Sequence, residues 1–127
     1  MTIVSITLSK HMRKIADMAW LAGILEGEGA FAVDKGRVRF TLHMTDQDII
    51  TRAAQIIGLP PKRIWAVPPT GSRRKTAYGI NVCGNQAASW LMTLYSWFGQ
   101  RRRTQVRQQL AMWKANRTRK MKYVGVR

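Results

Sequence analysis

The stretch Leu21-Ala22-Gly23-Ile24-Leu25-Glu26-Gly27-Glu28-Gly29 decides the fold of this chain. Its leucines and its isoleucine recur at helical spacing and form one apolar face. The alanine and the first glycine leave little side chain beside that face, so another backbone can approach closely there. The stretch ends in two carboxylates, Glu26 and Glu28, where the helix dipole favours cations instead. A divalent cation accounts for these acids better than helix stability does.

Two strands are expected directly after this helix. The helix itself is predicted over residues 10–26, or from Asp17 onward, with the glycines at its end. Residues 30–34 are typical of a strand, Lys35-Gly36 of a tight turn, and residues 37–44 of a second strand with strict alternation. One face of the second strand is apolar, and the other face carries Arg37, Arg39, Thr41 and His43.

The rest of the chain repeats this arrangement and then adds helices. Thr45 is expected to cap a helix that ends at Gly58, and acids in its first turn are favourable. Strands are predicted at 63–67 and 76–83, and helices at 86–98 and from Arg101 onward. The predicted fold is α+β in the order αββαββαα, with a twisted antiparallel four-stranded sheet backed by helices. Residues 1–9 are expected to form an arm, 10–115 one domain, and 116–127 a basic tail.

Charge is distributed unevenly along the chain. The net charge is +16, and all six acidic residues lie at or before Asp48. The first 48 residues also hold six basic residues, so the later part carries the whole excess. Such a chain needs a polyanionic partner, and nucleic acid is the usual one. Composition favours nucleic acid over a membrane surface, since no long basic helix with an aromatic face is evident.

Length and cysteine content indicate a soluble protein of a reducing compartment, such as the cytoplasm. The 127 residues suffice for one domain with a core, at 46% hydrophobic content. One cysteine, Cys83, forms no internal disulfide and is expected to be a buried thiol. The apolar residues among the first eight are too few for a signal peptide or a membrane span. No motif indicates a small-molecule substrate.

The stretch from Leu21 to Gly29 resembles the signature of the LAGLIDADG homing endonucleases. It is identical at Leu21, Ala22, Gly23 and Gly29 and acidic at both acidic positions, with Glu28 where the pattern has Asp. The predicted order of elements is similar to that of the family from about Asp17 to Ala115. Only one copy of the signature is present, which implies a homodimer acting on a near-palindromic site.

The resemblance implies a magnesium-dependent, sequence-specific double-strand DNA endonuclease. It implies metal binding by the Glu28 carboxylate and the Gly27 carbonyl, and a catalytic role for Arg101 or Arg102 near the scissile phosphates. Asp46 has two interpretations, a helix-start acid or a second active-site group. The implied dimer contact joins the two signature helices through Ala22, Gly23, Glu26 and Gly27.

The polar face of the predicted sheet is the expected DNA surface, because Arg, Thr and His can contact base edges or phosphates from a sheet in the major groove. A solvated strand face is the ordinary alternative. The expected DNA contacts are Ala32, Asp34, Lys35, Arg37, Arg39, Thr41, His43, Arg73, Arg74, Lys75 and Asn81.

Two other functions fit the charge. One is a DNA- or RNA-binding protein of the same fold that does not cleave, acting as a regulator or an intron maturase. The other is a structural RNA-binding protein of the ribosomal type. Glu28 discriminates between cleavage and binding, because a protein that only binds gains nothing from a carboxylate directed at phosphate.

Overall fold

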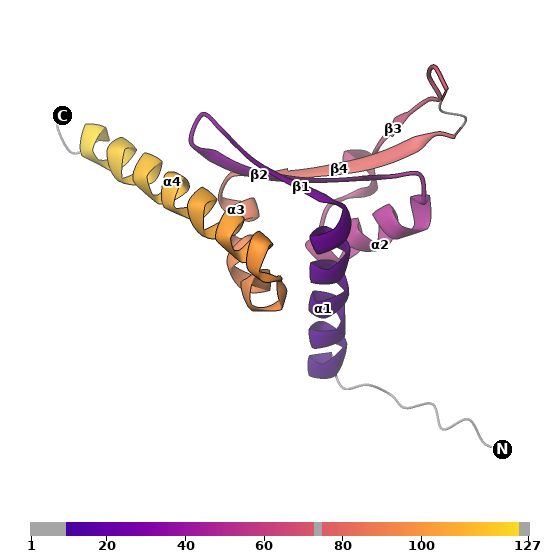
Figure 1. The fold of residues 1–127 in the computed structure, drawn as a ribbon, viewed down its shortest axis with the longest axis horizontal. Coiled ribbons are helices and arrows are strands. Elements are labelled where there is room, and N and C mark those ends of the chain that lie inside the picture. The colour runs from indigo at the N-terminus through magenta and orange to yellow at the C-terminus, as the bar shows by residue number, and fades with distance from the viewer. Residues whose placement is uncertain (1–9, 73–74, 125–127) are drawn as a thin grey trace.

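The computed structural model describes residues 10–72 and 75–124, the last six of them by their backbone alone. The expected arm over residues 1–9 lies outside the described residues. Figure 1 shows a sheet with helices beneath it and a long helix that extends to one side. The elements are α1 (Lys10–Glu28), β1 (Gly29–Asp34), β2 (Arg37–Met44), α2 (Gln47–Ile57), a 3₁₀ turn (Pro61–Arg63), β3 (Trp65–Val67), β4 (Ala77–Cys83), α3 (Gly84–Leu94), a second 3₁₀ turn (Tyr95–Trp97) and α4 (Gln100–Val124).

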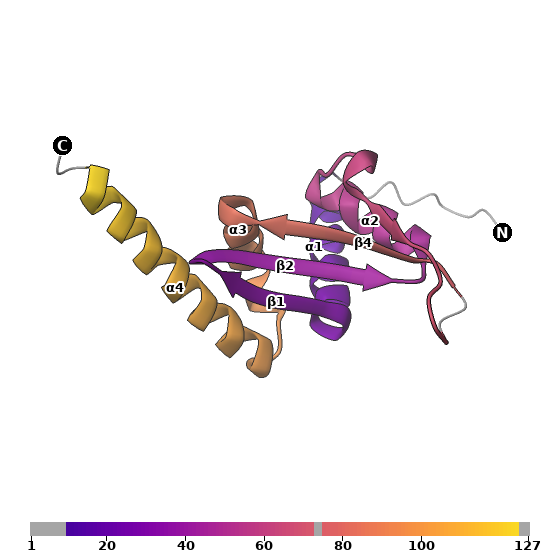
Figure 2. The ribbon, with the colours of Figure 1, turned by 90° about the horizontal axis from the view of Figure 1, so that it is seen from above.

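The four strands form one antiparallel sheet in the order β1-β2-β4-β3. β1 and β2 form a hairpin whose turn, Lys35-Gly36, has positive φ at both residues, as a tight two-residue hairpin requires. In Figure 2, seen from above, β1, β2 and β4 cross the molecule and leave their upper face uncovered. The predicted α+β fold and its order of elements are confirmed.

The core lies between the sheet and the helices. Val38, Phe40 and Leu42 of β2 are buried, as the alternation predicts, and they pack with side chains from every helix. From α1 the core receives Leu21, Ala22 and Leu25. The helices therefore cover one face of the sheet, and the other face is open to a partner. Across residues 10–72 and 75–124, no helix combines the length and apolar character that a membrane crossing needs.

Several boundaries differ from the predicted ones. Gly27 does not end α1, which continues through Glu28, and β1 begins at once with Gly29. Glycine weakens a helix without breaking it when neighbouring elements hold the helix in place. Asp46, not Thr45, is the N-cap residue of α2, and its side chain makes no capping hydrogen bond. β3 is shorter than predicted, because proline starts a 3₁₀ turn just before it.

The C-terminal helices also differ from the prediction. α3 begins at Gly84, earlier than predicted, and ends at Leu94, where a 3₁₀ turn takes over. α4 continues to Val124, so the predicted tail from residue 116 is helical in its first part. Contacts with the β1–β2 turn account for this extension, since the Asn116 amide nitrogen donates to the Gly36 carbonyl at 3.4 Å.

Candidate nucleic-acid interface and carboxylate site

The uncovered face of the sheet brings together most of the residues predicted to bind DNA. Strand pairing places Asp34 opposite Arg37, Ala32 opposite Arg39, and Thr41 opposite Asn81. The Thr41 hydroxyl donates to the Asn81 side-chain oxygen at 3.2 Å, so the two side chains share this face. His43 and Arg37 are exposed there, and Arg39 is half-buried.

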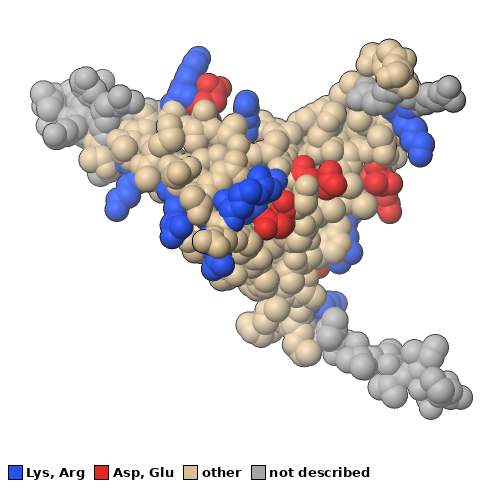
Figure 3. Space-filling view, viewed as in Figure 1, with Lys and Arg blue, Asp and Glu red and all other residues tan. Residues whose placement is uncertain are grey.

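This face is concave. Figure 3 shows its outline dipping between the β1–β2 turn and the β3–β4 hairpin, with lysine and arginine side chains on several flanks of the molecule. Lys35 and Lys75 are exposed at the two ends of the dip. Arg73 and Arg74, predicted to bind DNA beside Lys75, lie outside the described residues. Cys83 is only half-buried and lies on the open face instead of in the core, as a result of its register opposite Arg39.

Trp65 is a surface residue that the sequence analysis missed. Its side chain is 37% exposed on the open face and its ring lies 6.5 Å from the ring of His43. The ring covers Gly79, where an added Cβ would meet three ring atoms at 2.5–2.7 Å. A glycine inside a predicted strand is a signal for such a close approach. The side chain that approaches Gly79 is Trp65 because β3 pairs with β4. The local sequence around Gly79 does not indicate this pairing.

The two signature carboxylates differ in their contacts and in their exposure. Glu26 is directed toward the start of α4, where its Oε1 accepts a hydrogen bond from the Gly99 backbone N–H at 3.0 Å. Gly99 immediately precedes α4, and a carboxylate is favourable at a helix N-terminus. Glu26 therefore stabilises the contact between α1 and α4 within one chain; its side chain is 37% exposed, and its place in a dimer interface stays a prediction.

Arg102 is the second half of that contact. It is 7% exposed, and its guanidinium donates from Nε to the Glu26 carbonyl at 3.2 Å and from Nη2 to the Gly29 carbonyl at 2.6 Å. Its Nε also lies 3.7 Å from Glu26 Oε2. Burial lowers the pKa of Arg102, the charge of Arg101 lowers it further, and Glu26 opposes both effects. The side chain remains charged at neutral pH.

The guanidinium of Arg102 is engaged by the end of α1 and lies 4.6 Å from the centre of the Phe31 ring. Arg101 is exposed beside it. The catalytic role expected of one of these two arginines stays a prediction, and Arg101 is the more accessible of the two.

Glu28 is exposed at the last residue of α1, where the chain enters the sheet. The Gly27 carbonyl lies among the last four of α1, which have no partner inside the helix. Asp46 is exposed at the same edge, since β2 ends where β1 begins. Within the described part of the chain, no three His, Cys, Asp or Glu side chains cluster closely enough to hold a metal.

The residues predicted to form the dimer interface also differ in their exposure. Ala22 is 1% exposed and belongs to the core of its own chain, so it offers little surface to a partner, and its place in a dimer interface stays a prediction. Gly23 and Gly27 are exposed, and a Cβ added at either would meet nothing within 4 Å. Together with Ala16 and Ala19, which are also exposed, they form a flat stripe of small residues along α1.

Comparisons of the chain with protein-family models, with curated proteins and with solved structures gave no match.

Proposed function

We propose that the chain is a magnesium-dependent, sequence-specific double-strand DNA endonuclease of the LAGLIDADG homing type, active as a homodimer on a near-palindromic site. The observation that carries the proposal is the position of Glu28. Of the two signature carboxylates, Glu26 has a stabilising role in the fold, whereas Glu28 is exposed at the edge of the basic sheet with no such role. A carboxylate beside a polyanion surface is repelled unless a cation lies between them.

Magnesium fits the donors at this edge. It is commonly held by one or two carboxylates together with substrate phosphate oxygens and water, so it does not need three side chains from one protein. Glu28 and the Gly27 carbonyl are the donors that one chain provides. When bound, the metal supplies an activated water and stabilises charge on phosphate oxygens.

The residues of the chain supply position and charge. Arg102 and Glu26 fix the end of α1, and with it the Glu28 carboxylate, against the start of α4. Arg39, Thr41 and His43 hold the duplex along the sheet. The exposed Arg101 guanidinium stabilises negative charge on the reacting phosphate.

The homodimer rests on the small-residue stripe of α1. A glycine inside a helix costs about 1 kcal/mol relative to alanine. Within residues 10–72 and 75–124, nothing lies within 4 Å of a Cβ added at Gly23 or Gly27, so the described fold gives no packing reason for either glycine. Close approach of a second α1 gives such a reason, and it would place two Glu28 residues near one another.

A test of catalysis uses the Glu28→Gln variant, which keeps the shape and removes the charge. Cleavage of DNA selected from a random duplex library with magnesium should be lost, while affinity for the same DNA stays equal or rises because a repelling charge is gone. Asp17→Asn, near the middle of α1, is the matched control and should cut normally. Unchanged cutting by Glu28→Gln would remove this residue from the mechanism.

The second candidate is a nucleic-acid-binding protein of this fold that does not cleave. Trp65 favours it, because an exposed aromatic ring on a basic sheet can stack on an unpaired base. The two candidates differ in one assay. A non-cleaving protein would bind DNA or a folded intron RNA with magnesium present and leave every duplex of the library intact.

A further inference from the structure

A hollow at one end of the sheet has a composition that favours an anion. It lies between the β1–β2 turn, the start of α3 and the second half of α4, with a volume of about 390 Å³. Four of its seven lining residues are arginine or asparagine, which is a more polar set than the mainly apolar lining of small-molecule pockets. The lining residues are Gly36, Arg37, Gly84, Asn85, Trp113, Asn116 and Arg117.

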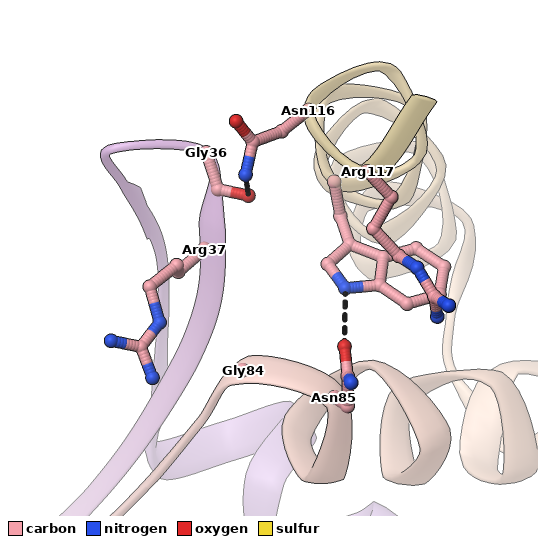
Figure 4. Close-up of a pocket in the computed structure, with 7 residues that line it drawn as sticks. Gly36, Arg37, Gly84, Asn85, Asn116 and Arg117 are labelled. Carbon is pink, nitrogen blue, oxygen red and sulfur yellow. Dashed lines mark hydrogen bonds between the residues drawn. The ribbon is translucent and has the colours of Figure 1, made fainter. Parts of the chain in front are cut away.

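Two hydrogen bonds from α4 hold the walls of this hollow together. The Trp113 indole nitrogen donates to the Asn85 side-chain oxygen at 3.2 Å, and Asn116 donates to the Gly36 carbonyl. Figure 4 shows both bonds reaching from α4, one to the hairpin turn and one to the first turn of α3. Because its oxygen is engaged by the indole, Asn85 keeps its NH₂ group as a donor.

Both charged residues of the hollow are arginines. Arg117 lies over the Trp113 ring, 5.0 Å from its centre, and Arg37 reaches from the opposite wall toward Gly84. No acidic residue lines the hollow, and within the described residues neither guanidinium forms an ion pair. Arg37 also borders a smaller hollow on the open face of the sheet, beside Asp34 and Arg39. The arginine hollow is thus continuous with the proposed DNA surface.

We propose that this hollow binds one backbone phosphate of the nucleic acid that lies on the sheet. The Arg117 guanidinium, held over the Trp113 ring, donates to this phosphate and the Asn85 amide donates a further hydrogen bond, while Arg37, whose guanidinium points away from Arg117 toward Gly84 (Figure 4), adds positive charge at the rim. Planar guanidinium groups match phosphate oxygens in pairs, which point charges such as lysine do not. The inference rests on the binding part of the proposed function and does not require cleavage.

The test measures duplex affinity as a function of salt for Arg117→Ala. Loss of this phosphate contact should lower the slope of log affinity against log salt by about 0.9 and weaken binding about tenfold for each protein chain bound to the duplex, equally for different sequences. The control is Arg107→Ala, an exposed arginine earlier on α4 that does not line the hollow. Equal slopes and affinities for the two variants would overturn the proposal.

A double-mutant cycle with Arg37→Ala tests whether the two arginines act on separate phosphates. Because their guanidinium groups point away from one another (Figure 4), the two losses in binding free energy should be additive, and non-additive losses would contradict this arrangement. Thermal unfolding of each variant checks that the fold is intact, and Arg117→Lys, which keeps charge without the planar group, should bind at an intermediate level.

Titration with inorganic phosphate separates the two sources of the anion. If free phosphate binds the hollow while Arg117→Ala leaves duplex affinity unchanged, the site takes a free anion and the proposal is wrong. If wild-type protein binds no duplex, the proposal is wrong as well. If the protein cuts DNA and Arg117→Ala changes neither binding nor cutting, only the phosphate site is wrong. If Arg117 contributes to binding but the protein never cuts DNA, only the proposed endonuclease activity is wrong.

Discussion

At the scale of single residues, the signature carboxylates form a pair in sequence but not in role. The Glu26 carboxylate accepts from the backbone in front of α4, and Arg102 from α4 binds the carbonyl groups at the end of α1. Each helix therefore supplies the opposite charge to the terminus of the other. The acid that looked unfavourable at the end of α1 is favourable at the start of α4, and only Glu28 is left to be explained by function.

Arg102 should be a major determinant of stability. Arg102→Leu removes the donors of the Glu26 and Gly29 carbonyl groups and leaves the Glu26 carboxylate without its ion pair. We expect a loss of about 3 kcal/mol in the free energy of unfolding, measured by urea denaturation. Glu26→Gln, which retains an oxygen for the Gly99 N–H, should lose only about 1 kcal/mol. Equal losses would mean that the carboxylate, not the arginine, carries the contact.

At the scale of elements, α1 has one buried face and one exposed face. Leu21, Ala22 and Leu25 are buried against the sheet, and the stripe with Gly23 and Gly27 is open. A Cβ added at Gly23 or Gly27 meets nothing within 4 Å among the described residues, so a loss of dimer after such a substitution reports on a second chain.

Gly23→Leu is the corresponding test. Because a Cβ at position 23 would meet nothing within 4 Å in the described part of the chain, the isolated fold should be unchanged or more stable by up to about 1 kcal/mol. The proposed dimer should be lost, since leucine separates the two helices. Light scattering with and without DNA gives the mass of the particle. A dimer that persists in Gly23→Leu would exclude this face as the interface.

Gly29→Ala is the contrasting variant on the same segment. Its Cβ would lie 2.6 Å from the Leu25 carbonyl oxygen and 2.9 Å from the Phe31 ring. It should therefore lower the stability of the chain itself, which Gly23→Leu should not do.

Sequence predicted those elements whose signals are local. The alternation through Val38, Phe40 and Leu42 gave β2 its bounds and its buried face, and the Lys35-Gly36 turn fixed the register of the hairpin. The helix ends were less accurate, because contacts from distant segments decide them. Asn116, for example, meets a turn 80 residues earlier in the chain, and helical structure continues past it.

The candidate site was predictable to a similar degree. The shared face of Arg39, Thr41 and Asn81 followed from strand alternation and is confirmed as a surface, whereas its contact with DNA stays a prediction. The burial of Arg102 and Ala22 was not predictable, since both depend on how α1 packs against other elements. The triplet of arginines at the start of α4 signalled an anionic neighbour, and that neighbour is Glu26.

At the scale of the whole molecule, the excess of positive charge belongs to the later part of the sequence, whereas on the surface acidic and basic side chains lie among one another (Figure 3). The chain carries +16, with every acid in its first 48 residues. If four cations of each chain contact phosphates, a dimer contacts eight, and log affinity against log salt should have a slope of about −7. This slope is measured by fluorescence anisotropy of a labelled duplex at salt concentrations from about 50 to about 300 mM. A slope shallower than about −3 would contradict binding along the sheet.

The length of α4 also sets a distance on the substrate. Its Arg102 end is fixed to α1 beside Glu28, and its Arg117 end borders the proposed phosphate hollow. Arg102 and Arg117 lie about 22 Å apart along the helix axis, at about 1.5 Å per residue. On a duplex with about 3.4 Å between base pairs, that spacing corresponds to about six or seven base pairs. A rigid helix of this kind acts as a ruler, so the anchored phosphate and the cut position would keep a constant separation whatever sequence lies between them.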